Sequence, residues 1–244
     1  MSPHLETITN TMMKTTASLF ALTAIFSTPL ASAAVYSSGH ADYGLAYEDG
    51  VLHFHFHAEG AIVDGIEVDD AEYEIGDVTT LVSSAAMETL PFDFPALGAS
   101  AGQSIWILPQ AQNEALPFLG LATEELAQSE WGNLSFTLGN VVSPSGSGEF
   151  AVWQTGSFGE LLLNMSTADP GADVITLLPG VHSHYNFGFS EVGTWQIEIT
   201  VSGTHATDGF KSSTETLTFQ VVPEPSAALL GGLGMLGLIL RRRR

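Results

Sequence analysis

The sequence predicts an all-β fold for residues 34–221, an antiparallel β-sandwich with Ig-like or Greek-key connections. Short segments alternate apolar and polar residues, which is the period of a strand with one buried face. Turn-forming residues recur about every ten positions along this part of the chain. About ten short strands with little helical periodicity favour two packed antiparallel sheets.

The first predicted strands form a hairpin. Residues 43–47 lead to a turn at Glu48-Asp49-Gly50, and residues 51–58 return with strict alternation. One face of the returning strand carries His53, His55 and His57, and the other carries Leu52, Phe54, Phe56 and Ala58. Residues 64–75 alternate acidic and apolar side chains, which predicts one further strand with a carboxylate-rich outer face. Residues 79–87 fit a strand or a short helix, and residues 91–98 fit a loop.

The later part of the domain repeats the strand pattern. Strands are predicted at residues 105–108, 133–138, 149–154, 160–165, 173–177, 181–189, 194–202 and 215–221. One helical turn is predicted at residues 123–128, with Thr123 as its cap and Glu124 and Glu125 in its first turn. Alternation in residues 181–189 places His182, His184 and Asn186 on one face. Residues 204–213 are a candidate linker.

The first 33 residues have the layout of a secretory signal peptide. Lys14 precedes an apolar run at residues 17–26, and the triplet Ala31-Ser32-Ala33 predicts cleavage after Ala33. Because Met12 stands close before Lys14, the residues that precede it fit a mis-assigned start. We therefore expect export through the Sec translocon.

The C-terminal segment, residues 222–244, combines three features. They are the triplet Pro223-Glu224-Pro225, an apolar run at residues 227–240, and the cluster Arg241, Arg242, Arg243 and Arg244. The run is shorter than the roughly 20 residues that span a bilayer comfortably, and the arginines would hold that end on the cytoplasmic side. An ordinary membrane anchor is the alternative interpretation.

This segment resembles the PEP-CTERM sorting signal of Gram-negative bacteria. The resemblance implies recognition by an exosortase-like processing enzyme, with the short apolar segment as a transient transmembrane helix in the inner membrane. It also implies a final location at the cell surface or outside the cell. The domain between the two terminal segments is then the part that acts there.

The charge of that domain restricts its partners. With one lysine, Lys211, against 25 acidic residues, residues 34–221 carry a formal charge of −24 before histidines are counted. Such a surface repels nucleic acid and anionic lipid, and it favours cations. Solubility alone is the other explanation of the acidity. The absence of cysteine from the sequence excludes a disulfide framework, a thiol nucleophile and cysteine-type metal sites.

Histidines recur at the spacing of metal ligands. Residues i and i+2 of a strand project from the same face about 6.5–7 Å apart, so two imidazoles can converge on one ion. The sequence has His182-x-His184, His53-x-His55-x-His57 and Gly39-His40-Ala41-Asp42. A third histidine or a carboxylate would complete a zinc or manganese site. The alternative is that these stripes are the polar faces of half-buried strands, and His205, in a polar turn, is given no metal role.

A further resemblance covers most of the domain. It rests on Ser38-Gly39-His40-Ala41-Asp42, Leu108-Pro109-Gln110, residues 118–125 (FLGLATEE), residues 181–189 (VHSHYNFGF) and Gly193-Thr194-Trp195. These motifs resemble the choice-of-anchor M domain, which is similar to the repeat domain of actinobacterial surface-anchored proteins. The resemblance implies surface attachment and, since some relatives are encoded near transporters similar to metal-uptake systems, metal handling. It carries over to His40, Asp42, His182, His184 and Asn186; the family usually has Trp where this chain has Phe187.

Catalysis has weak support in the sequence. The Ser/Gly stretch at residues 143–148 does not match the Gly-x-Ser-x-Gly pattern of a nucleophile elbow, and carboxylates are too abundant for one pair to indicate glycosidase chemistry. We therefore predict an exported cell-surface protein that is not an enzyme and has a structural or binding role. The alternative is a zinc- or manganese-binding surface domain that uses His40, Asp42, His182 and His184, or His53, His55 and His57. A metallohydrolase on the same ligands is the third interpretation.

Overall fold

The computed structural model describes residues 32–171 and 173–223. This part contains β-strands and three short 3-10 helices, with no α-helix among the residues described: η1 (Ile75–Asp77), η2 (Ser84–Ala86) and η3 (Pro95–Leu97). The all-β prediction is confirmed. Nothing in the described ranges forms a helix long and apolar enough to cross a membrane. The signal peptide, apart from its last two residues, and the predicted C-terminal helix lie outside the described residues.

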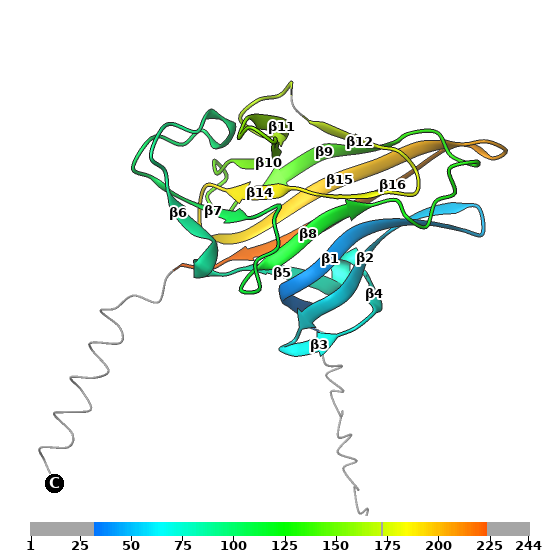
Figure 1. Cartoon of the computed structure of the whole chain (residues 1–244), viewed down its shortest axis with the longest axis horizontal. Coiled ribbons are helices and arrows are strands. Elements are labelled where there is room, and N and C mark those ends of the chain that lie inside the picture. Colours follow the sequence, from blue (N-terminus) through cyan, green and yellow to red (C-terminus); the bar gives the residue numbers. More distant parts are fainter. Residues whose placement is uncertain (1–31, 172, 224–244) are drawn as a thin grey trace, which may run out of the picture. The chain divides into compact units, whose positions relative to one another are not determined.

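The larger of two sheets carries most of the strands (Figure 1). Its main path runs, in spatial order, through β12 (Val174–Leu177), β9 (Leu134–Val142), β15 (Gly193–His205), β16 (Gly209–Val221), β5 (Val78–Val82), β1 (Ala34–Glu48), β2 (Val51–Val63) and β3 (Ile66–Val68). Three strands lie off this path: β4 (Ala71–Glu74) pairs with β2, β8 (Pro117–Ala122) with β1, and β13 (His182–His184) with β8.

The smaller sheet packs against the larger one. Its order is β11 (Leu161–Ser166), β10 (Phe150–Thr155), β14 (Asn186–Phe189), β7 (Ser104–Leu108) and β6 (Met87–Thr89). The rings of Phe150, Phe187 and Phe189 lie 5.1–6.5 Å from that of Phe219 on β16 of the larger sheet. These contacts give the two sheets one shared apolar core. Ig-like or Greek-key connections stay a prediction.

The prediction that all strands run antiparallel is wrong. β1 pairs in parallel with β5 through Ala34–Tyr36 and with β8 through Gly39–Gly44, and β16 also pairs in parallel with β5. Strand alternation has the same period in both kinds of sheet, so the sequence pattern does not indicate the direction of a neighbour that is distant in the chain.

A pair of bulges reverses the faces of β1 and β2. Tyr36 and Ala41 both belong to the core although they are five positions apart, an odd number that would place them on opposite faces of a regular strand, and the register of β1 against β2 shifts between them. β2 reverses at the same level, since Ala58 and Ala61 are both fully buried. The register shifts lie between Tyr36 and Ser38 and between Gly39 and His40, and two glycines with positive φ stand at the second shift, Gly39 (φ 85°) and Gly60 (φ 69°). The reversal places His40 and Asp42 on the outer face while Tyr36 stays inside.

Several predicted element boundaries change. Residues 64–75 do not form one strand: Asp64 and Gly65, both with positive φ, make the tight hairpin turn between β2 and β3, and a bend at Asp69 and Asp70 separates β3 from β4. Residues 204–213 are the hairpin between β15 and β16 and not a linker. Residues 181–189 divide at Tyr185, with β13 in the large sheet and β14 in the small one.

The helical turn predicted at residues 123–128 does not form. Thr123 is fully buried, and its hydroxyl donates a hydrogen bond to the Leu178 carbonyl (2.6 Å) or to that of Val181 (2.9 Å). The side chain therefore fixes the loop before β13 and does not cap a helix. Glu124 and Glu125 lie in a short turn that begins directly after Thr123.

Replacing Gly39 with alanine tests the bulge. An alanine Cβ would overlap with the Gly60 carbonyl oxygen, and φ at this residue is unfavourable for any L side chain. We expect Gly39→Ala to lower the free energy of unfolding by about 2–4 kcal/mol in a denaturant titration. Gly76→Ala is the control, because no atom lies within 4 Å of its added Cβ. Equal losses in the two variants would contradict this account of β1.

Candidate metal site

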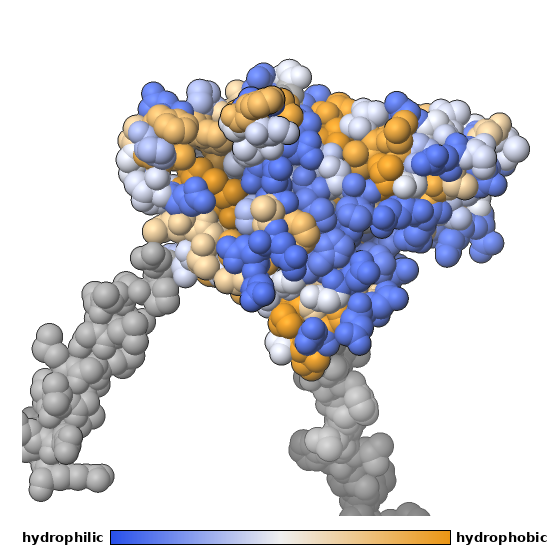
Figure 2. Space-filling model, viewed as in Figure 1, coloured by the Kyte–Doolittle hydropathy of each residue, from blue (hydrophilic) through white to orange (hydrophobic). Residues whose placement is uncertain are grey.

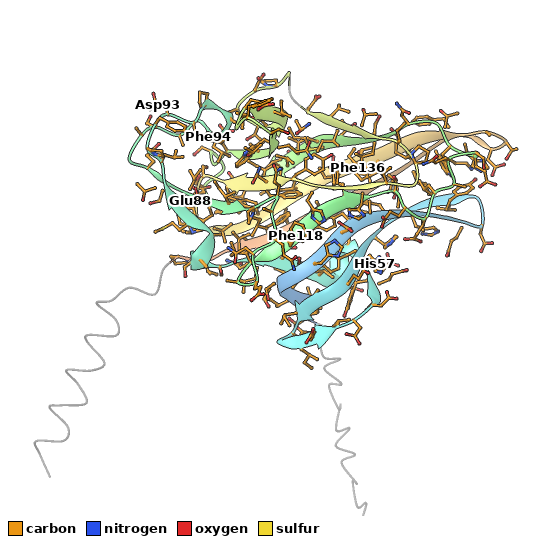
Figure 3. The ribbon with its side chains drawn as sticks, in the orientation of Figure 1. His57, Glu88, Asp93, Phe94, Phe118 and Phe136 are labelled. Carbon is orange, nitrogen blue, oxygen red and sulfur yellow. The ribbon has the colours of Figure 1, made fainter. Side chains whose placement is uncertain are left out.

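Most of the candidate metal-ligating histidines and carboxylates lie on one face of five neighbouring strands, in the order β4, β2, β1, β8 and β13. Asp42 on β1 lies opposite His57 on β2 and beside Gly120 on β8, and Gly120 in turn lies opposite His184 on β13. Residues directly opposite one another in neighbouring strands point to the same face. Hydrophilic residues gather over β8, β1 and β2 (Figure 2), and Figure 3 labels Phe118 and His57 on the two strands that flank β1.

Three imidazoles meet on this face. The Nε2 atoms of His40 and His184 lie 3.2 Å apart. The ring centroid of His182 lies 6.0 Å from that of His40 and 5.5 Å from that of His184. One ring nitrogen from each of the three histidines can be chosen so that all lie within 4.8 Å of one another. The His-x-His spacing on β13 thus combines with a histidine that is distant in the sequence.

Two of the three imidazole rings each have a carboxylate near their Nδ1 atom. Nδ1 of His182 hydrogen-bonds Glu124 (2.7 Å), and Nδ1 of His40 lies 3.5 Å from Glu59. Metal-bound histidines commonly donate their second ring nitrogen to a carboxylate, which fixes the tautomer and increases the basicity of the coordinating nitrogen. The hydrogen bond with Glu124 raises the pKa of His182 against the effect of burial. In both rings, Nε2 is the atom that remains for a ligand.

His184 is held by an aromatic ring. Phe118 stacks on it, with centroids 3.7 Å apart and planes 6° from parallel. Burial, together with the nearby His40 ring, lowers the pKa of His184 to about 4. The ring is therefore neutral at pH 7 and keeps a nitrogen lone pair for coordination. Its Nδ1 is buried without a hydrogen-bond partner.

Asp42 is the buried acid of the cluster. The residue is 4% exposed, and its Oδ1 has no hydrogen-bond partner. Its Oδ2 lies 3.4 Å from Nε2 of His40. Burial raises the pKa of Asp42, while the His40 and His182 rings oppose that shift. A buried carboxylate oxygen without a partner costs folding free energy unless a positive charge approaches it.

Gly120 provides the space beneath these groups. An alanine Cβ at this position would overlap with Oδ1 of Asp42 and lie 3.2 Å from the His184 ring. The residue opposite a histidine and beside an aspartate therefore has no side chain, which lets both reach over β8. A glycine in a strand often marks such a close approach.

The distances fit a tetrahedral ion. With zinc–ligand bonds of 2.0–2.1 Å, two atoms of a tetrahedral site lie about 3.3 Å apart. The His40–His184 separation of 3.2 Å and the His40–Asp42 separation of 3.4 Å both match that value. A hydrogen bond between two neutral imidazoles explains the first distance equally well.

The other histidines discussed above and Asn186 do not join this cluster. His53 is exposed, His55 lies near Glu125, and Nε2 of His57 contacts Asp70 (2.8 Å), so the three do not share one site. Asn186 is away from the histidines, where it holds Gln110 and accepts its backbone N–H (3.0 Å). His205 is buried and accepts a hydrogen bond from the Asp208 backbone N–H.

Sequence reasoning missed four residues that build the cluster: Glu59, Phe118, Gly120 and Glu124. Phe118, Gly120 and Glu124 lie in a motif quoted for the family resemblance, but the helical prediction placed Glu124 in the first turn of a helix capped by Thr123. No sequence pattern pointed to Glu59, because only the register of β1 against β2 brings it near His40.

Comparison with known proteins identifies the C-terminal segment. Residues 221–244 match the PEP-CTERM protein-sorting motif, which includes the predicted triplet Pro223-Glu224-Pro225 and the four arginines. The motif is recognised by an exosortase-type processing enzyme, and the chain is an exported protein that is processed at the cell envelope. No curated protein and no solved structure matches the chain. Passage through the Sec translocon, inner-membrane anchoring and a Gram-negative origin stay predictions.

Gly120→Ala tests the packing of the cluster. We expect it to lower the thermal unfolding midpoint, because the new Cβ must displace Asp42 or His184. Gly132→Ala is the matched control, since its Cβ meets only an ordinary contact at 3.8 Å. In an Asp42→Ala background Gly120→Ala should cost much less, which a double-mutant cycle measures. Additive losses would show that Asp42 does not occupy the space above Gly120.

Proposed function

We propose that the domain at residues 34–221 is a non-catalytic, metal-binding domain of the cell surface. His40, His182 and His184 are the proposed ligands, Asp42 is the fourth, and zinc is the preferred ion with manganese as the weaker candidate. The observation that carries the proposal is the convergence of three imidazole nitrogens beside a buried carboxylate oxygen that has no partner.

The donor set favours zinc. Imidazole nitrogens suit zinc, whereas manganese prefers oxygen-rich sites, and the general affinity order also places zinc above manganese. Three histidines and one aspartate give four ligands, the usual number in a closed structural or storage site. The formal charge of −24 on the domain raises the local concentration of cations around it.

The family resemblance supports the same function. We propose that the domain is a choice-of-anchor M domain. Of the five residues carried over by resemblance, His40, His182 and His184 converge, and Asp42 lies 3.4 Å from His40. The fifth, Asn186, supports the loop at Gln110 and is not a proposed ligand. The PEP-CTERM segment delivers the domain to the envelope, and metal binding is the role proposed for it there.

We keep catalysis out of the proposal. A hydrolase needs a group that binds or polarises its substrate, and Lys211, the one lysine of the domain, donates to the Gly50 carbonyl (2.7 Å) at the far end of the β1–β2 hairpin. A metallohydrolase remains the alternative from another class. Turnover of an ester, peptide or phosphate substrate that chelation abolishes would favour it over a binding protein.

Metal titration tests the proposed ligands. Purified protein without a polyhistidine tag is stripped with a chelator and then titrated with Zn²⁺. A ligand at about 100 times its Kd stabilises the folded state by roughly 2.7 kcal/mol, which a thermal melt detects. We expect that gain in wild type and in His53→Ala, and its loss in the double variant His182→Ala/His184→Ala. Equal gains in all three proteins would rule out this site.

Glu124→Gln tests the carboxylate behind His182. Loss of such an outer partner typically weakens metal binding by about 10–100-fold, and we expect a fall in zinc affinity of that size by calorimetry. Glu130→Gln removes the same formal charge from an exposed position nearby and should leave the affinity almost unchanged. If both variants weaken binding equally, general electrostatics and not the His182–Glu124 pair sets the affinity.

A further inference from the structure

A second histidine on the same face is buried without a hydrogen-bond partner. His55, on β2, is 8% exposed, and its Nε2 has no partner. The ring lies over Gly44 of β1, where an added Cβ would be 2.8 Å from Nε2. Like Gly120 beneath Asp42, Gly44 provides space for a polar side chain on the outer face. An imidazole nitrogen in this position lacks the partner that buried polar groups almost always have.

Two carboxylates converge on this nitrogen from different elements. Glu72 comes from β4, and Glu125 comes from the turn after β8; with His55 they offer three ligand atoms that all lie within 4.8 Å of one another. Oε1 of Glu125 lies 3.2 Å from Nε2 of His55, yet outside hydrogen-bond geometry. Two atoms that bind the same ion are also close together without a hydrogen bond between them, since each points at the ion and not at the other.

The surroundings favour a cation. A cleft of about 310 Å³ opens beside the cluster, and its lining includes Gly44, His57, Asp70, Glu72, Glu124 and Glu125. Four of these six residues are acidic, and histidines are their neighbours: His57 contacts Asp70, and His182 hydrogen-bonds Glu124. The cleft is open to solvent through exposed Glu72 and Glu125, so an ion can enter it.

We propose a second divalent-cation site at His55, Glu72 and Glu125. Its one nitrogen and two carboxylate donors suit zinc and manganese more evenly than the histidine-rich cluster does. It is carried by different residues from those of the proposed function, so either site can exist without the other. The adjacent residues Glu124 and Glu125 serve one site each: Glu124 orients His182 and Glu125 is a ligand with His55.

Calorimetry on the full-length, tag-free and chelator-treated protein separates the two sites, with Zn²⁺ as the probe. We expect two binding events in wild type. Glu72→Gln and Glu125→Gln should each weaken one event by about tenfold or more and leave the other unchanged. Both residues are exposed, so these variants avoid the folding risk of replacing buried His55. Glu74→Gln is the matched control, because Glu74 is an exposed acid on β4 in register with His55 but outside the cluster.

Each outcome decides one question. An event that survives His182→Ala/His184→Ala and is lost in Glu72→Gln and Glu125→Gln supports the second site. A single event, lost in the histidine variant and unchanged in both glutamate variants, overturns the second site while the proposed function holds. Glutamate variants that behave like Glu74→Gln show that His55 and Glu125 form only an ion pair. No zinc binding in wild type overturns both proposals.

Discussion

The geometry of the outer face depends on the reversal of β1 in the irregular segment between Tyr36 and His40. Before the bulge Tyr36 packs in the core, and after it Ala41, Tyr43 and Leu45 do so. A regular strand cannot bury both Tyr36 and Ala41, because its side chains alternate between the two faces and residues an odd number of positions apart lie on opposite faces. Only with the extra residue do His40, Asp42 and Gly44 all face outward, beside the histidines of β2 and β13. The hydrogen bond from the Tyr36 hydroxyl to the Gly39 carbonyl (2.6 Å) ties the bulge to the core.

Small residues decide what can gather on that face. Gly44 and Gly120 occupy positions where a side chain would displace His55 or Asp42. The two glycines have ordinary strand conformation, so the reason for glycine there is space and not backbone freedom. Three of the side chains buried in this way, those of Asp42, His55 and His184, each have one nitrogen or oxygen atom without a hydrogen-bond partner. Three such atoms lie on one face of one sheet, the face where we propose that cations bind.

Much of this arrangement could be predicted from the sequence. Strict alternation in residues 51–58 placed the histidines opposite Leu52, Phe54 and Phe56, and burial of those three confirms it. The family resemblance named the His-x-His pair on β13 together with the Gly-His-x-Asp motif on β1, and the structure brings the two motifs together. Within each strand, alternation indicates the face of a residue because a strand fixes the faces of nearby residues through local geometry alone.

The missing parts depend on pairing between segments that are distant in the chain. β8 lies between β1 and β13, parallel to β1 and antiparallel to β13, and this order brings Phe118, Gly120 and Glu124 to the histidines. The same pattern of residues would fit an antiparallel neighbour, so the sequence did not reveal the contact. Thr123 was assigned to a helix cap for a related reason, since its actual partners, Leu178 and Val181, are more than 50 positions away.

The most direct test of the central claim is X-ray absorption spectroscopy at the zinc edge on protein loaded with one equivalent of Zn²⁺. We expect a four-coordinate ion with imidazole nitrogens at about 2.0–2.1 Å and one carboxylate oxygen at a similar distance. His182→Ala/His184→Ala should remove most of the imidazole signal. A spectrum of six oxygen ligands without imidazole, or one that this double variant leaves unchanged, would contradict the account.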